Sequence, residues 1–229
     1  LPRADLVIST SSFLQRRFGG EVVRMGVDTD RFRPPDPAGR KAVRAELGLE
    51  DEQRVIVFGG VVRPHKGVEW ILEAMRRTGD PRWRLLVIGP ITDTLSGLMG
   101  GPMGARIVAA GAKPSTEMPR WLGAGDLTVL PLADDLLAQS QVPCKVYEAM
   151  AMGLPVLASE VSDLSEIVAG AGATFPAGDV EALAGLLRQW FRDPSAVAAH
   201  AREARRRAVE LYSVAVMRNQ LQAAVDRLA

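Results

Sequence analysis

The sequence predicts a doubly wound α/β domain built around a parallel sheet. Short apolar runs rich in Val and Ile alternate with amphipathic stretches, which is the pattern of repeated β-α-β units. Nearly all of these runs are apolar throughout, as expected of strands that helices cover on both faces. A chain of 229 residues with 47% hydrophobic residues is also long enough to bury a core.

The first half of the predicted sheet comes from residues 54–60, 83–90 and 105–111. The runs RVIVFGG and WRLLVIGP place apolar residues directly before a glycine, which allows a tight strand exit. Residues 67–79, GVEWILEAMRRTG, have helical spacing and a glycine at each end. The run GLMGGPMG, residues 97–104, is the most linker-like segment, and we expect a mobile loop there.

The second half of the sheet is predicted from three further apolar runs, with a helix before or after each one. The strands are residues 126–132, 155–159 and 172–175, and the helices are residues 115–125, 142–153, 163–170 and 179–193. Residues 194–212 and 213–229 then form two consecutive helices without a strand between them. The last helix carries an apolar stripe that needs a partner surface: Val214, Met217, Leu221, Val225 and Leu228.

Composition narrows the functional classes. The chain has 28 basic and 27 acidic residues, so no overall field favours nucleic acid. The single cysteine, Cys144, excludes an internal disulfide framework and a cysteine-rich zinc site, and two histidines make a histidine metal site a poor prediction. No apolar run approaches the roughly 20 residues of a membrane span. We therefore expect a cytoplasmic protein that needs no metal, and the start at Leu1 rather than Met suggests a fragment.

A possible diphosphate site follows the strand at residues 54–60. Gly59 and Gly60 permit a ligand to approach backbone N–H groups, and Arg63 and Lys66 supply positive charge. The helix that opens near Gly67 points its positive end the same way. The alternative is that the glycines only turn the chain while the two cations are solvated.

A possible ribose site lies on the helix that Pro143 opens. Its residue Glu148 is a carboxylate near a helix start at a strand exit, where it can accept hydrogen bonds from both hydroxyls of a ribose. The alternative, which spacing alone favours, is an ordinary surface ion pair between Lys145 and Glu148.

Several motifs together resemble the retaining glycosyltransferases of family 4, which have the GT-B fold. They are ADLVISTSSFLQRRFG with VVRMGVDTDRFRP, then FGGVVRPHKGVEWILEAM, GAGDLTVLPL and KVYEAMAMGLPVLASEVSDLSEIV, in that order along nearly the whole chain. Proteins of this family have two Rossmann-like halves that face each other across a cleft. The C-terminal half binds a nucleotide-diphospho-sugar and the N-terminal half binds the acceptor, and this chain resembles the C-terminal half.

The resemblance implies roles for individual residues. Lys66 matches the lysine that contacts the donor diphosphate, and Gly59 and Gly60 match the glycine loop beside it. Glu148 matches the second glutamate of the family's signature of two glutamates separated by seven residues, which holds the ribose. The segment from Ala110 and Gly111 to Lys113 matches the region that cradles the base.

Two positions depart from the family pattern. The usual arginine falls on Val61, so that Arg63 becomes the expected substitute beside Lys66 in the catalytic group. The first glutamate of the signature falls on Ser140, which leaves recognition of the sugar open. Some relatives with a helix like PCKVYE also lack this glutamate. We expect Ser140 and Lys145 of this segment among the donor-binding residues, together with Glu148.

The resemblance implies transfer of a sugar from a UDP- or GDP-linked donor to an acceptor hydroxyl, with no metal and no separate cofactor. Residues 1–20 would be a remnant of the acceptor half and the crossover, residues 21–212 the donor domain, and residues 213–229 a helix that packs against the missing half. A sugar-nucleotide epimerase or a glycogen-type phosphorylase of GT-B fold would share this architecture. A non-catalytic sugar-nucleotide-binding or scaffold domain is the alternative from a different class. The acceptor would be a sugar, a lipid-linked molecule or another small molecule. A lipid-linked acceptor would allow peripheral contact with the inner membrane face, where the basic residues near Arg205 could bind, but a solvated helix face is the favoured explanation of these residues.

Overall fold

The computed structural model describes residues 4–228 and contains a six-stranded parallel sheet in the order β5-β4-β3-β6-β7-β8. All six predicted strands are confirmed. They are β3 (Arg54–Gly59), β4 (Trp83–Ile88), β5 (Ile107–Gly111), β6 (Leu127–Leu130), β7 (Val156–Ser159) and β8 (Gly172–Phe175). The chain runs outward from β3 in one direction and then returns to add β6 on the other side, so the predicted doubly wound α/β fold is confirmed.

The sheet separates two hydrophobic cores because successive side chains of a strand point to opposite faces. In β3, Val55 and Val57 lie in one core, whereas Ile56 and Phe58 lie in the other. All four side chains are at most 2% exposed. This two-sided burial explains why the strands read as continuous apolar runs.

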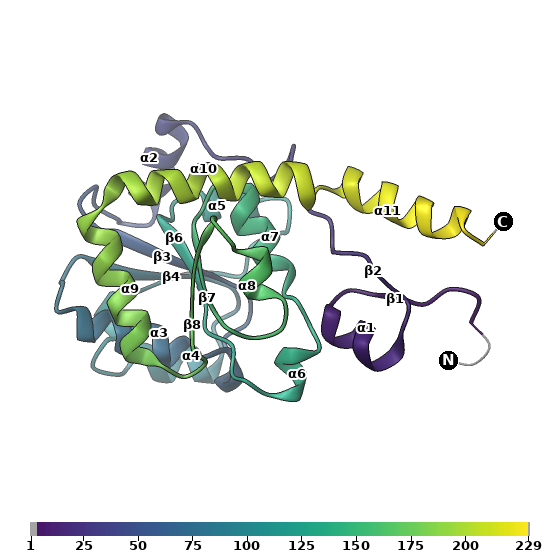
Figure 1. Ribbon diagram of the computed structural model, residues 1–229. Coiled ribbons are helices and arrows are strands. Elements are labelled where there is room, and N and C mark those ends of the chain that lie inside the picture. Colours follow the sequence, from purple (N-terminus) through teal and green to yellow (C-terminus); the bar gives the residue numbers. More distant parts are fainter. Residues whose placement is uncertain (1–3, 229) are drawn as a thin grey trace.

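Helices cover both faces of the sheet (Figure 1). One core takes in side chains of α3 (Val68–Thr78), α4 (Asp93–Met99) and α9 (Val180–Arg192). The other takes in side chains of α2 (Pro37–Glu46), α5 (Met118–Leu122), α7 (Cys144–Ala151), α8 (Leu164–Ile167) and α10 (Pro194–Leu211). The prediction of a loop over residues 97–104 is wrong at both ends, because α4 reaches Met99 and the 3₁₀ helix η2 (Gly104–Arg106) begins at Gly104. Thr92 caps α4 by accepting from the Leu95 N–H, a start signal that sequence reading overlooked.

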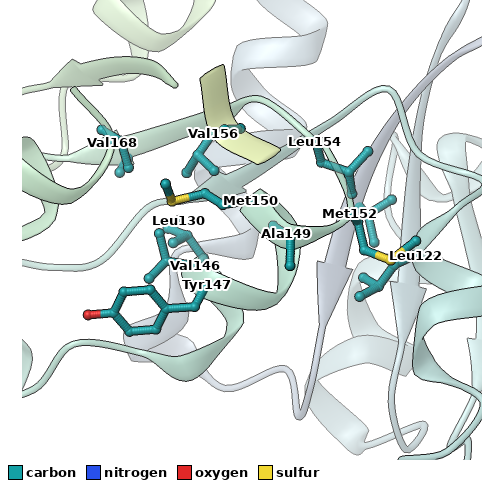
Figure 2. Close-up of a cluster of buried hydrophobic side chains, with 14 of the residues drawn as sticks. Leu122, Leu130, Val146, Tyr147, Ala149, Met150, Met152, Leu154, Val156 and Val168 are labelled. Carbon is teal, nitrogen blue, oxygen red and sulfur yellow. The ribbon is translucent and has the colours of Figure 1, made fainter. Parts of the chain in front are cut away.

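Helix α7 packs one face onto the sheet, as its apolar spacing predicts. Val146, Ala149 and Met150 are at most 2% exposed. Figure 2 shows Val146 and Met150 close to Leu130 and Val156, which belong to two neighbouring strands. This packing fixes the rotation of α7 and so decides where its polar face points.

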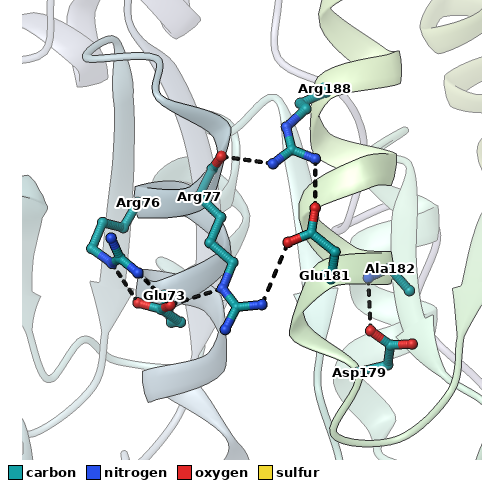
Figure 3. Close-up of polar contacts among 7 residues, drawn as sticks. All are labelled: Glu73, Arg76, Arg77, Asp179, Glu181, Ala182 and Arg188. Atoms are coloured by element: carbon teal, nitrogen blue, oxygen red, sulfur yellow. Dashed lines mark hydrogen bonds and ion pairs between the residues drawn. The ribbon is translucent and has the colours of Figure 1, made fainter.

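Helices α3 and α9 are also joined by an exposed polar network (Figure 3). Arg188 donates to the Arg77 carbonyl oxygen at 2.7 Å and to Glu181 at 2.8 Å, and Arg77 in turn reaches Glu181 and Glu73. Asp179 caps α9 by accepting from the Ala182 N–H at 2.8 Å. Exposed ion pairs add little stability individually, so we regard the network as setting the alignment of two helices that the apolar core already holds together.

The first and last elements of the chain lie on the same side of the main sheet (Figure 1). There β1 (Ile8–Ser9) and β2 (Glu21–Val22) form a small parallel sheet with α1 (Ser12–Phe18) between them. Helix α11 (Val214–Asp226) joins this region because the Met217 sulfur accepts from the Gly26 N–H at 3.2 Å. The predicted apolar stripe is therefore covered at its start, while Val225 and Leu228 are each 51% exposed.

A buried ion pair ties the N-terminal region to the main domain. Arg24 donates to Asp163, which also accepts from the backbone N–H and hydroxyl of Ser12. The hydrogen bonds and the charge of Arg24 outweigh the effect of burial, so the pKa of Asp163 lies below its ordinary value.

The basic stretch near Arg205 has a structural role in part. The Arg205 guanidinium donates to the carbonyl oxygens of Thr29, Phe32 and Ala151, and Arg206 pairs with acidic residues of its own helix. Arg205 thus connects α10 to the segment that leads into α2. This structural role differs from both sequence-based expectations, which were membrane contact and a solvated helix face. No helix within residues 4–228 has the length and apolar character needed to cross a membrane.

The exits of β3, β4 and β5 are interlocked through their backbones. The Gly60 N–H donates to the Ile88 carbonyl oxygen at 2.8 Å, and the Gly89 N–H donates to the Gly111 carbonyl oxygen at 3.0 Å. A Cβ atom built on Gly89 would lie 2.2 Å from the Gly60 oxygen, which is far inside van der Waals contact. Only a residue without a side chain fits at position 89.

We therefore predict that Gly89→Ala lowers the free energy of unfolding by about 1–3 kcal/mol, the usual effect of overpacking. Gly97→Ala is the matched control, because a Cβ built on this helical glycine meets no atom within 4 Å. Alanine there should leave stability unchanged or raise it by up to about 1 kcal/mol. Urea denaturation of both variants measures the difference, and equal stability of the two would contradict the steric argument.

Candidate functional site

A cavity of about 480 Å³ opens at the carboxyl edge of the sheet. The exits of three neighbouring strands line it: Gly59, Gly60 and Val61 at the end of β3, Ile88, Gly89 and Pro90 at the end of β4, and Ala112 and Lys113 after β5. Helices α5 and α7 close it with Met118, Leu122, Cys144, Lys145, Glu148 and Ala149. Most of these residues lie far apart in sequence, and the parallel sheet brings them to one edge.

This cavity lies at the point where the sheet changes direction. The chain leaves β3 toward β4 on one side and later returns to β6 on the other. The loops after β3 and after β6 consequently diverge and leave a crevice, which is where open α/β sheets bind their ligands.

Lys66 ends the 3₁₀ helix η1 (Pro64–Lys66) and lines the cavity with a half-buried side chain. The next residue, Gly67, has a positive φ of 60°, and a Cβ there would lie 2.3 Å from the Pro131 carbonyl oxygen. This glycine sets the turn between η1 and α3, so the sequence prediction that Lys66 stands at the opening of a helix is confirmed.

Lys145 is the second lysine of the cavity and lies in the first turn of α7. Its ammonium nitrogen is 4.4 Å from the centre of the Phe58 ring and 3.4 Å from the position of a Cβ built on Gly60. Burial and the positive charge of Lys66 lower the pKa of Lys145 to about 8, although Glu148 acts in the opposite direction.

Glu148 lies one turn after Lys145 and also lines the cavity with a half-buried side chain. Burial raises the pKa of its carboxyl group, while the charges of Arg31 and Lys145 oppose that shift. Within residues 4–228 its carboxylate has neither a hydrogen-bond partner nor an ion pair, so the surface pair with Lys145 that the spacing favoured does not form. Both carboxylate oxygens remain open to a ligand.

The other predicted site residues divide into those at the cavity and those beside it. Gly59, Gly60 and Lys113 line it, and the Lys113 ammonium lies 3.9 Å from the centre of the Trp121 ring. Ala110 and Gly111 belong to β5 and stop just short of the cavity, which Ala112 reaches instead.

Arg63 and Ser140 do not line the cavity. Arg63 is exposed, and Val61 occupies the wall at the position where the family pattern has its arginine. The hydroxyl of Ser140 donates to the Leu137 carbonyl oxygen at 2.8 Å. Participation of Arg63 and Ser140 in ligand binding stays a prediction.

The structure also corrects the expected use of the glycine loop. The Gly60 N–H is already bonded to the Ile88 carbonyl oxygen, so it is not directed at the cavity as a donor. Sequence reasoning missed the wall formed by Gly89 and Pro90, although a Gly-Pro pair directly after the buried run at residues 83–88 was a signal for it. It also missed that Cys144 lines the cavity.

Comparison with known proteins agrees with this arrangement. Residues 52–193 match the family described as Glycosyl transferases group 1. The D-inositol 3-phosphate glycosyltransferase of Streptomyces avermitilis is 32% identical over 203 residues, which cover 82% of this chain and 42% of that protein. The lipopolysaccharide core biosynthesis mannosyltransferase LpsB of Rhizobium meliloti is 28% identical, with 86% of this chain and 58% of that protein covered.

Solved structures share the fold. Anabaena HepE in complex with UDP superposes with a TM-score of 0.85 at 22% identity, covering 98% of this chain and 64% of that one. Sucrose-phosphate synthase from Thermosynechococcus elongatus gives a TM-score of 0.82 at 24% identity, covering 99% of this chain and 59% of that one. The chain thus spans less than two thirds of each of these four proteins. Because the family match extends over more than half of the chain and includes β3 through α9, the chain belongs to the group 1 glycosyl transferases.

Proposed function

We propose that this chain is the donor-binding half of a retaining glycosyltransferase of family 4, which moves a hexose from a nucleotide-diphospho-sugar to an acceptor hydroxyl. The observation that supports this proposal most directly is the cavity at the carboxyl edge of the sheet. It combines lysine side chains with the carboxylate of Glu148, which forms no hydrogen bond or ion pair with any described residue. Cations suit a diphosphate, and an ionised carboxylate suits the two hydroxyls of a ribose.

In the proposed reaction, the bond between the anomeric carbon and the diphosphate oxygen breaks and its electron pair remains on the diphosphate. Negative charge therefore grows where Lys66 is positioned. Cations that are fixed before the reaction stabilise such charge without reorganisation at the moment of transfer. Retention of the anomeric configuration enters the proposal from the sequence motifs that resemble family 4.

The nucleotide is UDP or GDP in this proposal, and UDP is the first to test. HepE, which shares the fold, was solved with UDP and with UDP-glucose. The acceptor would be a small molecule or a lipid-linked sugar, bound by a second half of the same protein. The full-length protein would then act in the cytoplasm or at the inner membrane face.

The domain boundaries are part of the same proposal. Residues 1–20 would belong to the acceptor half and the crossover, and residues 213–229 would pack against that half. The exposed Val225 and Leu228 on α11, together with Phe18 on α1, which is 52% exposed, support an additional apolar contact there.

A non-catalytic domain of the same fold is the second candidate. It is favoured by Val61 in the cavity wall and by a Ser140 hydroxyl that bonds to Leu137. Calorimetric titration with UDP, GDP and ADP separates the two candidates, because a scaffold domain has no need to bind any of them.

Cys144 provides a second assay, since it is the single cysteine and lines the cavity. A bound nucleotide should slow its reaction with a thiol reagent.

We predict that Lys66→Ala weakens binding of UDP at least about tenfold, because one charge-assisted hydrogen bond contributes roughly 1.5–3 kcal/mol. Binding of uridine should be almost unchanged, since the lysine is proposed to contact only phosphate. Calorimetry with both ligands measures the difference, with Lys41→Ala on the exposed face of α2 as the control. Equal weakening of UDP and uridine would remove Lys66 from the diphosphate site.

Glu148→Gln should impair binding of UDP more than binding of its 2′,3′-dideoxy analogue. The carboxylate is proposed to accept from both ribose hydroxyls, whereas a glutamine amide offers only one acceptor atom. The expected loss for UDP is about tenfold, and Glu52→Gln on an exposed loop is the control. If the variant loses the same affinity for both nucleotides, the ribose assignment is wrong.

We also predict that the chain binds a nucleotide sugar yet transfers no sugar by itself. Binding of the donor requires only the described cavity, whereas transfer requires a positioned acceptor, which can lower a barrier by several kcal/mol. The measurement is product formation from UDP-glucose or GDP-mannose with a panel of acceptors, with and without the remaining half of the protein supplied separately. Rapid transfer by this chain alone would contradict the assignment of the acceptor site to the other half.

A further inference from the structure

We infer that Lys145 is the second cation that binds the donor diphosphate, next to Lys66 and beside the Gly60 backbone. This inference rests on the proposed function. It gives Lys145, which the sequence placed only among the donor-binding residues in general, the specific role of partner to Lys66 at the diphosphate. It assigns to a residue of helix α7 the charge that was expected from Arg63 in the loop after β3.

The first argument is the position of the ammonium group. Both Lys66 and Lys145 line the same cavity, although they come from different elements. The Lys145 nitrogen lies 3.4 Å from the Cβ position of Gly60, whose φ of 115° is rarely adopted by residues with a side chain. Glycine is therefore favoured at position 60 by its backbone conformation, and the lysine ammonium lies directly beside this bare backbone in the cavity wall.

The second argument is elimination among the other donors. The Gly60 N–H is bonded to the Ile88 carbonyl oxygen and cannot serve as a free phosphate donor. Arg63 is exposed and does not line the cavity, and the Lys113 ammonium is placed over the Trp121 ring at 3.9 Å. The basic side chains that line the cavity are thus Lys66, Lys113 and Lys145. Lys113 and Lys145 each lie over an aromatic ring, but Lys145 is the one whose ammonium comes within 4 Å of the Cβ position of Gly60.

The third argument is that the charge of Lys145 has no counterion in the free protein. Within residues 4–228 its ammonium has no ion-pair partner, and Glu148 attracts it only over a longer distance. Its contact with the Phe58 ring, at 4.4 Å, is a cation–π interaction that holds the side chain in place. A positioned cation that is repelled by Lys66 gains most when an anion binds between the two, and a diphosphate has the required charge and extent.

The charge of Lys145 should consequently depend on the ligand. In the free protein its pKa is lowered to about 8, so the ammonium loses its proton as the pH rises through that value. A bound diphosphate favours the charged form, so binding above pH 8 takes up a proton and becomes weaker as the pH rises. The charged and titratable groups around it are Lys66, Glu148, Lys113 and Cys144, with Arg31 acting on Glu148.

The test compares Lys145→Met and Lys145→Arg with the unchanged chain. Methionine keeps the length of the side chain without its charge, and arginine keeps the charge. Calorimetry with UDP and uridine at pH 7 should show UDP binding at least about tenfold weaker for Lys145→Met, with uridine within about twofold. Lys145→Arg should recover most of the UDP affinity. The melting temperature of the ligand-free Met variant should not fall, because a half-buried charge repelled by Lys66 has been removed.

A pH series provides a readout that a structural role would not change. Between pH 7 and pH 9, UDP affinity of the unchanged chain should fall about tenfold, as expected for one required proton with a pKa near 8. The dependence should be absent in Lys145→Arg and in Lys145→Met, and Cys144→Ser should retain it. The phosphate groups are largely ionised over this range, and the same pH series with uridine corrects for titration of the uracil ring.

The outcomes separate this inference from the proposed function. If the unchanged chain binds none of UDP, GDP and ADP, the proposed function fails and the inference fails with it. If Lys66→Ala weakens UDP binding while Lys145→Met does not, the proposed function stands and the inference is overturned. Equal loss of UDP and uridine affinity in Lys145→Met, or a melting temperature that falls in both variants, would show that Lys145 supports the fold rather than the ligand.

Discussion

The close contact between the backbones of Gly60 and Gly89 is the constraint on which the rest of the site depends. It brings the exits of β3 and β4 together so tightly that a Cβ on Gly89 would lie 2.2 Å from the Gly60 oxygen. The contact forms part of the cavity wall and uses the Gly60 N–H within the sheet. As a result, recognition of an anion at this edge falls to side chains that reach over the glycines from neighbouring elements.

Those side chains are presented by elements with rigid support. Lys66 precedes α3, which is packed on the sheet and aligned with α9 by the network around Glu181. Lys145 and Glu148 lie on α7, whose opposite face is buried between strands of the sheet. Because both supports are fixed by apolar packing, the unpaired charges of the cavity are held in place before a ligand arrives, which is the condition for effective electrostatic stabilisation.

The region formed by β1, α1, β2 and α11 is attached to the main domain in a different way. Its links include the Arg24–Asp163 ion pair, the contact of Met217 with Gly26 and the backbone bridge between Val27 and Ser213. These links are local and largely polar, and several apolar side chains of the region remain exposed. The main domain, in contrast, has two continuous cores on either side of its sheet.

The sequence by itself determined the sheet, its strands and most of the helices that cover it. Buried parallel strands must be apolar on both faces, and most of them end at or directly before a glycine or a proline. It also drew attention to Lys66 and Glu148, for which spacing alone left a surface role open and the resemblance to a known family favoured a binding site. The structure places both at the cavity. Only the tertiary structure decided which charges meet. The rotation of α7 places the Lys145 ammonium beside Gly60. The path of the chain after β3 leaves Arg63 outside the cavity. The Gly60 N–H, which was expected to face a ligand, is bonded to the Ile88 carbonyl oxygen instead. These positions depend on how segments far apart in sequence pack together. The spacing of residues along a single segment carries no information about that packing.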